Sequence, residues 1–179
     1  MFLDDAVAVG RAKADLCARH GLVGHFPLDV SPAPDLRGDE APLALFDICV
    51  AMMQRCDLAI VNLTPYRGVS MDVGSAVEMG YVFASGKPVF GYTNDADDYR
   101  ARVEAADRVG GTAVEDFGLA DNLMCEGVVR RSGGLVVRRG VDAASEADRL
   151  RHLEGFHDCL HQALHVLRSG PARPRRRSG

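Results

Sequence analysis

The stretch DLAIVNL, residues 57–63, is a continuous apolar run of strand length, and it leads into a Pro/Gly loop, TPYRGVSM. A helical pattern follows at 72–85, and then a second apolar run, PVFGYT, at 88–93. Continuous runs of this kind are typical of parallel strands that are covered on both faces. The order strand, helix, strand therefore predicts an α/β fold with a parallel sheet.

Helical patterns on both sides of this unit place it in a larger structure. Helices are predicted at about 4–20, 41–55, 97–106 and 142–167. The expected architecture is a Rossmann-like or flavodoxin-like parallel sheet flanked by helices. A doubly wound sheet normally begins with a strand, whereas this chain begins in a helix. We therefore expect the first strand of the sheet to be missing from the chain.

The length and composition suit one globular domain. The chain has 179 residues, of which 47% are apolar and 26% charged, so it can form a full hydrophobic core. A single domain is expected over residues 1–168. The remaining residues, 169–179, form a basic segment with four arginines, which we expect to be a disordered, solvated tail.

Charge and cysteine content exclude several functional classes. The net charge of −4 argues against nucleic acid as the main partner. No run of about 18 apolar residues is present, so no membrane span is predicted. The five cysteines are odd in number and lack CxxC spacing, which favours reduced thiols and a cytoplasmic location. GxxxxGK is absent, as is GxGxxG after a strand, so an NTP or dinucleotide site has little support.

Glu78 is the residue that most needs a chemical explanation. It is the only charged residue between Val73 and Ser85, in a stretch that otherwise predicts a buried helix. Ionised carboxylates are rarely buried without a partner. Two interpretations remain open: a helix face that touches solvent or pairs with Arg67, and an oriented carboxylate in a cleft that acts as a nucleophile at a sugar carbon.

Asp72 precedes the same helix and also has two interpretations. An aspartate at this position accepts hydrogen bonds from the free amides of the first helical turn. It can also take part in chemistry, because capping and catalysis are compatible. Asp72 and Glu78 are six residues apart and do not share a helical face, yet both can border a cleft at the carboxyl ends of the strands.

The segment CDLAIVNLTPYRGVSMDVGSAVEMGYVFASGKPVFGYTN, residues 56–94, resembles the nucleoside 2-deoxyribosyltransferase family. That family shows a strand, then P-[FY]-R-G, then D-x-G-[TS]-x-x-E-[LM]-G, then G-K-P-V, and all four occur here in order. Two flanking segments also match: FLDDAVAVGRAKADLCARHGLVGHFPLD near the start and FGLADNLM at 117–124. The resemblance covers about residues 1–125, and the ordered set of motifs is far more specific than any one of them.

The resemblance implies an enzyme that exchanges bases on 2-deoxyribonucleosides without metal or cofactor. Glu78 matches the family nucleophile, which attacks C1′ and carries the deoxyribosyl group as an ester, with retention of configuration. Asp72 matches the carboxylate that contacts the base and helps to manage its proton. The implied partners are deoxyribonucleosides and free nucleobases. The implied substrate-binding residues are Asn122, Met124, Asp29, Arg67 and Gly68.

The resemblance also implies a homo-oligomer with shared active sites. Asn122 and Met124 resemble an N-x-M motif that family members lend to the neighbouring subunit's site, where the asparagine contacts the sugar. Three features depart from the family pattern. The opening strand, roughly YLAGP with a Tyr that hydrogen-bonds the nucleophile, is not found. Cys49 stands where Asp or Asn is common, and Ser31 falls near an expected base contact.

Two alternative functions remain open at this stage. The first is hydrolysis of the N-glycosidic bond of 2-deoxynucleosides or their monophosphates, with water replacing the second base. The second is a nucleoside-binding protein without turnover.

Three histidines in the predicted C-terminal helix are candidate metal ligands. His157, His161 and His165 are four residues apart and share one helical face, with Cys159 nearby. Zinc needs a third or fourth ligand at tetrahedral range, so a solvated or partly buried helix face is favoured and no metal site is predicted.

Overall fold

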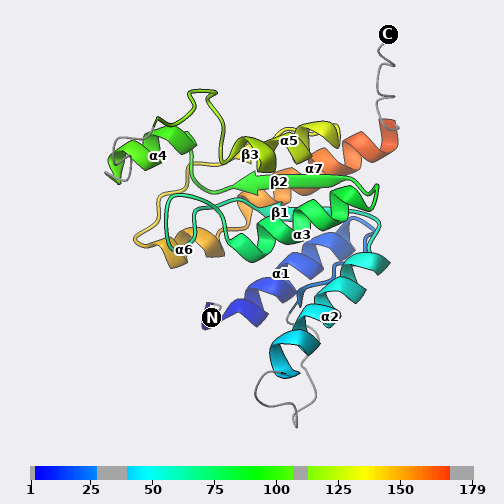
Figure 1. Ribbon diagram of the computed structural model, residues 1–179. Helices are drawn as coiled ribbons and strands as arrows, with labels where there is room; N and C mark the ends of the chain where they lie inside the picture. The colour runs from blue at the N-terminus through cyan, green and yellow to red at the C-terminus, as the bar shows by residue number, and fades with distance from the viewer. Residues whose placement is uncertain (1–2, 28–39, 107–112, 170–179) are drawn as a thin grey trace.

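The computed structural model describes residues 3–27, 40–106 and 113–169, and its centre is a parallel sheet (Figure 1). The strands are β1 (Ala59–Asn62), β2 (Val89–Thr93) and β3 (Val137–Arg138), in the spatial order β1-β2-β3. Ala59 pairs with Val89 and Tyr92 with Val137, and both pairings are parallel. The predicted α/β fold with a parallel sheet is confirmed.

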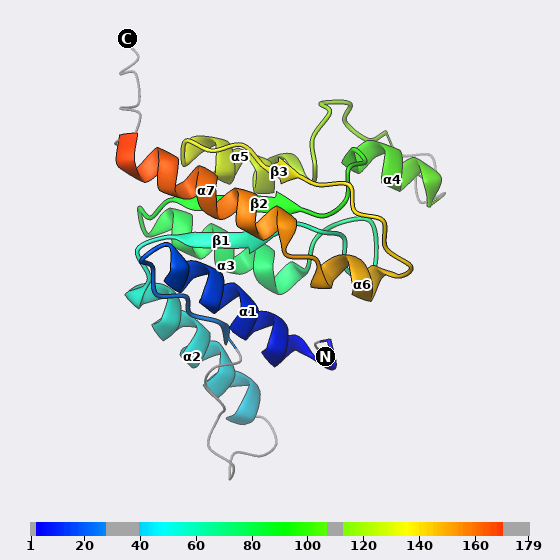
Figure 2. The same ribbon diagram turned by 180° about the vertical axis from the view of Figure 1, so that it is seen from behind.

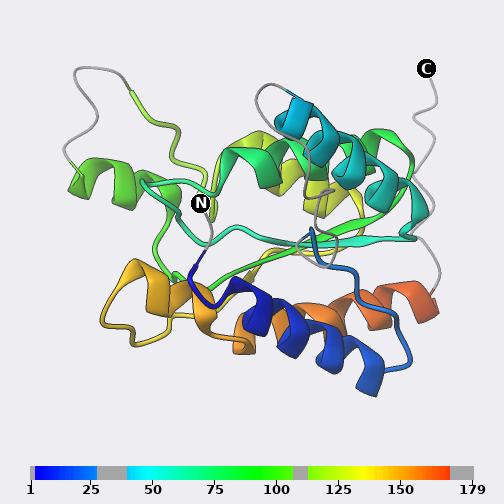
Figure 3. The same cartoon turned by 90° about the horizontal axis from the view of Figure 1, so that it is seen from below.

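Helices cover both faces of this sheet. Helices α1 (Ala6–Arg19) and α7 (Glu154–Ser169) lie on one face, and α2 (Glu40–Arg55), α3 (Val73–Ala84) and α5 (Leu123–Arg131) lie on the other (Figures 2 and 3). Figure 3 shows the sheet edge-on between these two layers. The three-layer arrangement explains why the two strand runs are apolar without alternation.

The side chains of β2 divide between two hydrophobic cores. Phe90 and Tyr92 point toward α1 and α7, whereas Val89 packs with residues of α3 and α5. Gly91 lies on the second side, where a Cβ would be only 2.6 Å from Cδ1 of Leu63. All five residues of β2 are buried, because the strand is central as well as covered on both faces. β1 is only partly buried, since it lies at one end of the sheet in the described part of the chain.

The predicted helix at 142–167 is wrong as a single element. The structure has α6 (Glu146–Arg151), a break at His152–Leu153 and then α7. His152 is extended, with φ −63° and ψ 132°. The buried Nδ2 of Asn94 donates hydrogen bonds to the carbonyls of Arg149 and His152, at 2.8 and 2.9 Å. These carbonyls need partners where α6 ends, and Asn94 supplies them from the end of β2.

Several elements at the carboxyl end of the strands complete the fold. Helix α4 (Tyr99–Ala105) and α6 lie at this end of the sheet (Figure 1). No element was predicted for 123–141, where the structure has α5 and β3. None of the described helices has the length and apolar character needed to cross a membrane. Within the predicted tail, residues 170–179 lie outside the described residues, so its disorder and the domain limit stay predictions.

Candidate active site

Glu78 lies on the wall of a cavity beside the edge strand. The chain leaves the carboxyl end of β1, crosses the loop at 63–72 and enters α3, which places Glu78 in the second helical turn. The cavity has a volume of about 380 Å³ and lies between β1 and helices α1, α2 and α3. Ser75 of α3 and Asn62 of β1 also line it. The cavity follows the outer edge of β1 from Asp57 to Asn62, so it is not confined to the carboxyl ends of the strands.

Asp72 begins the helix that carries Glu78. Its Oδ2 accepts a hydrogen bond from the backbone N–H of Ser75 at 2.9 Å and another from the Ser75 hydroxyl at 3.2 Å. The predicted N-cap is thus confirmed. The side chain is only half-buried, which leaves carboxylate surface for other contacts. Asp72 is not among the residues that line the cavity, although its charge acts on Glu78.

The surroundings of Glu78 disfavour its charge. Burial raises the pKa of the Glu78 carboxyl, and the negative charge of Asp72 raises it further. A hydrogen bond with the Cys49 thiol acts in the opposite direction and stabilises the carboxylate. A partly desolvated carboxylate next to a second carboxylate in a cleft is an arrangement that active sites use to tune nucleophiles and acids.

Cys49 of α2 lies next to Glu78. From the sequence, this position was notable only because family members commonly have Asp or Asn there. Burial raises the pKa of the Cys49 thiol, and the charge of Glu78 and the hydrogen bond to it add to the effect. The thiol therefore stays protonated and can donate its S–H to the carboxylate. The contact depends on how α2 packs against α3. The spacing of residues in the sequence does not reveal this packing.

The opposite wall of the cavity is formed in part by α1. Lys13 lines it, with Nζ at 5.7 Å from the ring centroids of both Tyr92 and Phe156. Burial lowers the pKa of Lys13 to about 8. Tyr92 and Phe156 also line the cavity and meet edge to face at 5.9 Å. The cavity is thus lined by a carboxylate, an amine and aromatic side chains.

Asp121 organises the loop that leads to Asp72, although the sequence marked only the motif around it and not this role. Its carboxylate is fully buried and accepts hydrogen bonds from the Ser70 hydroxyl and from the backbone N–H groups of Met71 and Asn122. The guanidinium of Arg102 lies 3.9 Å away. Asp121 sits within the motif FGLADNLM, but its role depends on a contact with residues 50 positions earlier.

Asn122 and Met124 do not reach the cavity of their own chain. Asn122 caps α5, where its Oδ1 accepts a hydrogen bond from the Met124 N–H at 3.0 Å. Both side chains are exposed, Met124 to 70%, and the described residues that line the cavity include none from α5. These two residues are therefore free to contact another molecule, whereas their part in substrate binding stays a prediction.

The remaining predicted substrate-binding residues lie in loops. Arg67 has a left-handed backbone, with φ of 55°, and its N–H donates to Oε1 of Glu146 at 2.8 Å. Its guanidinium lies 4.8 Å from the centroid of the Tyr66 ring. Gly68 follows it, and neither residue lines the cavity described above. Asp29 and Ser31 lie outside the described residues.

Comparison with known proteins finds a matching family and similar proteins. The family Nucleoside 2-deoxyribosyltransferase matches residues 1–124. The uncharacterized protein C191.05c of Schizosaccharomyces pombe is 29% identical over 160 residues, covering 76% of each chain. The solved structure of a 2-desoxiribosyltransferase from Leishmania mexicana superposes with a TM-score of 0.54 at 27% identity, covering 81% of this chain and 85% of that one.

Proposed function

Because this chain belongs to the nucleoside 2-deoxyribosyltransferase family, we propose that it transfers the 2-deoxyribosyl group between nucleobases through a covalent ester on Glu78. One observation carries the proposal. Glu78 is a half-buried carboxylate on the wall of a cavity of about 380 Å³, with Asp72 and Cys49 as its electrostatic neighbours. This is the chemical environment that a carboxylate nucleophile needs at an anomeric carbon.

The reaction would proceed in two displacements. In the first, an oxygen of Glu78 bonds to C1′, the C1′–N bond breaks, and its electron pair stays on the base nitrogen. The departing base then takes up a proton, with Asp72 as the nearby carboxyl group that can manage it. In the second, a nitrogen of another base attacks C1′ from the opposite side, and the ester oxygen leaves as the Glu78 carboxylate. The incoming base loses its N–H proton, which Asp72 can take up. Two inversions retain the configuration.

The electrostatics of the site support this sequence of steps. Positive charge develops on the sugar as the base leaves, and the carboxylate of Glu78 stabilises it. Burial and the charge of Asp72 raise the pKa of Glu78, so the carboxylate is less stabilised in the resting site than in water. In the transition state, the positive charge on the sugar offsets the unfavourable free energy of the charged Glu78 carboxylate. Cys49 keeps a hydrogen bond on the carboxylate, which favours the ionised nucleophile.

We expect the protein to convert deoxyinosine and free adenine into deoxyadenosine and hypoxanthine. Chromatography of all products checks this. Inosine should react at least about tenfold more slowly, because its 2′-hydroxyl destabilises positive charge at C1′ and needs a partner in the site. Free deoxyribose in place of deoxyadenosine would identify a hydrolase, and ligand binding without base release would identify a binding protein. Equal rates with inosine and deoxyinosine would contradict the assignment.

We further propose that the protein is a homo-oligomer in which α5 completes the site of a neighbouring subunit. The layer formed by α2, α3 and α5 exposes many large apolar side chains. Those more than 60% exposed are Leu43, Val73, Val77 and Met124. Apart from Glu78, α3 carries no charged residue, so its outer surface is apolar or small. Large apolar side chains exposed in this number favour association between subunits.

Shared sites predict that two inactive variants restore each other. Mixed Glu78→Ala and Asn122→Ala subunits should recover up to about a quarter of wild-type activity in a dimer, because half of the dimers are mixed and each holds one intact site. The measurement is base exchange after verified subunit exchange. A mixture of Glu78→Ala with Asp72→Ala serves as the control and should stay inactive, since both groups come from the same chain. Equal recovery in the two mixtures, or none in either, would point away from shared sites.

The cellular setting follows from the same proposal. Transfer between bases reuses an existing deoxyribosyl group, which places the reaction in nucleotide salvage. All five cysteines are free thiols in the structure. Reduced thiols are typical of a cytoplasmic protein, and we propose that location for this one.

A further inference from the structure

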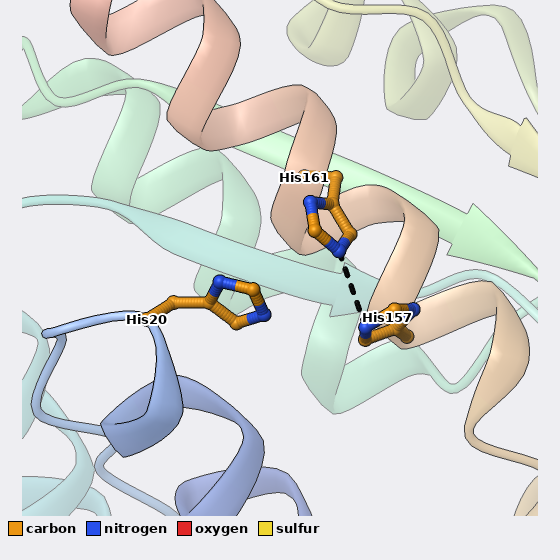
Figure 4. Close-up of side chains that lie close together, drawn as sticks. All are labelled: His20, His157 and His161. Atoms are coloured by element: carbon orange, nitrogen blue, oxygen red, sulfur yellow. Dashed lines mark hydrogen bonds between the residues drawn. The ribbon is translucent and has the colours of Figure 1, made fainter.

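Three histidines from two helices meet on the α1 and α7 side of the sheet. His20 follows the last residue of α1, and His157 and His161 are one turn apart on α7 (Figure 4). One ring nitrogen of each lies within 4.8 Å of one from each of the other two. The Nε2 atoms of His157 and His161 are 3.2 Å apart. None of the three residues lines the cavity at Glu78, so this cluster is separate from the proposed active site.

The position of His20 is set by the packing of α1 on α7. Cys17, one turn before His20, belongs to the same buried core as Cys159, Leu160 and Ala163 of α7. The backbone N–H groups of His20 and Gly21 donate to carbonyls of the last turn of α1, which holds the end of the helix in place. The His20 imidazole is therefore held beside the α7 pair by the core rather than by a flexible loop.

The spacing of the nitrogens matches a tetrahedral metal site. Two imidazole nitrogens bound to zinc at about 2.0–2.1 Å and at a tetrahedral angle lie about 3.3 Å apart. His157 and His161 already have this separation. The ring nitrogen of His20 would need to move by at most about 1.5 Å to reach it, which a side-chain rotation can supply. His161 is exposed, so an ion can enter from solvent and keep a water as its fourth ligand.

The groups around His20 have opposite effects on the binding of a metal ion. The imidazoles of His157 and His161 lie beside that of His20, with ring centroids 6.0 and 4.7 Å away, and neutral imidazoles are the form that binds metals. Arg168 and Arg19 contribute positive charge near His20 and weaken the binding of any cation. We therefore expect a site of moderate affinity rather than a tightly held structural ion.

We propose that His20, His157 and His161 bind one divalent transition-metal ion, with Zn²⁺ as the best match to three imidazoles and a water. The ion would join α1 to α7 and stabilise the packing of the two helices. This site takes no part in base exchange. Its presence or absence can therefore be established whether or not the protein is a deoxyribosyltransferase.

The test is titration of metal-free, untagged full-length protein with Zn²⁺, followed by calorimetry. Wild type should bind one ion per chain with a higher Tm when saturated. His20→Ala and His161→Ala should each bind at least about tenfold more weakly, because three ligands fall to two. His165→Ala is the matched control: it removes an exposed histidine one turn further along α7 and should bind like wild type. Each variant is first compared with wild type by its Tm without metal.

His20→Ala is the decisive variant, since only the folded structure joins His20 to α7. Unchanged zinc binding by His20→Ala would overturn the three-ligand site and leave a simple pair on α7. Equal losses in His165→Ala and His161→Ala would show unspecific binding along the helix. X-ray absorption of zinc-loaded wild type provides a measurement that needs no variant. Three imidazole ligands and one oxygen are expected, and a shell of thiolate sulfur would contradict the proposal.

Discussion

Replacement of Glu78 by glutamine is expected to lower the rate of base exchange at least about a hundredfold while the protein stays folded. Glutamine keeps the volume of the side chain and can still bond Cys49. It removes the negative charge and the nucleophilic oxygen on which the proposed ester depends. Loss of the charge also relieves the repulsion with Asp72, so stability should be unchanged or slightly higher.

The measurement is steady-state base exchange, together with the Tm of each protein. Glu115→Gln is the matched control, because it makes the same change at an exposed position outside the site and should keep normal rates. Mass spectrometry of wild type incubated with deoxyinosine alone should also find a deoxyribosyl adduct on the 72–81 peptide. Near-normal turnover by Glu78→Gln would remove this residue from the mechanism.

Replacement of Asp121 by alanine is expected to lower the free energy of unfolding by about 3–5 kcal/mol, because it removes one partner of a buried ionic network. The side chain of Asp121 is fully buried and that of Arg102 is only 8% exposed. The Met71 N–H and the Ser70 hydroxyl would lose their acceptor as well. Since this loop leads directly to Asp72, base exchange should also fall in the protein that remains folded.

Urea unfolding of Asp121→Ala and Asp116→Ala measures the free energy of unfolding of each variant. The comparison separates the effect of losing a buried aspartate from the effect of losing a negative charge. Asp116 also pairs with an arginine, Arg100, at 2.8 Å, but its side chain is 72% exposed. Exposed ion pairs contribute at most about 1 kcal/mol, so Asp116→Ala should be close to wild type. Similar losses in the two variants would mean that Asp121 does not organise the loop as the structure indicates.

Elements whose signal lies within a short window were predictable. The apolar runs at 57–63 and 88–93 contain β1 and β2, and the pattern at 72–85 contains α3. Asp72 was predicted as a cap, because its partner Ser75 is only three residues away. In each case the residues that decide the structure are neighbours in the chain. The spacing of apolar and capping residues then predicts the secondary structure directly.

The break between α6 and α7 shows where such patterns fail. The helical periodicity from 142 to 167 continues through His152, so it predicts one helix. In the structure α6 ends at Arg151, and Asn94, 58 residues from His152, donates hydrogen bonds to the carbonyls of Arg149 and His152 at this break. A polar side chain buried at the end of β2 needs partners, and it finds them where the helix would otherwise continue. The sequence of residues 142–167 alone does not show that Asn94 hydrogen-bonds to this segment.

The candidate site also combines features that the sequence predicts with features that only the folded structure shows. The sequence by itself determined the two strands β1 and β2, the helix that carries Glu78 and the family motifs around it. Only the tertiary structure brought the Cys49 thiol to Glu78, the Asp121 carboxylate to the loop before Asp72, and His20 to the imidazoles of α7. The physical reason is that hydrogen bonds and metal–ligand bonds act over a few ångströms, here between groups that are far apart in the chain. Which groups come that close is decided by how the helices pack on the two faces of the sheet.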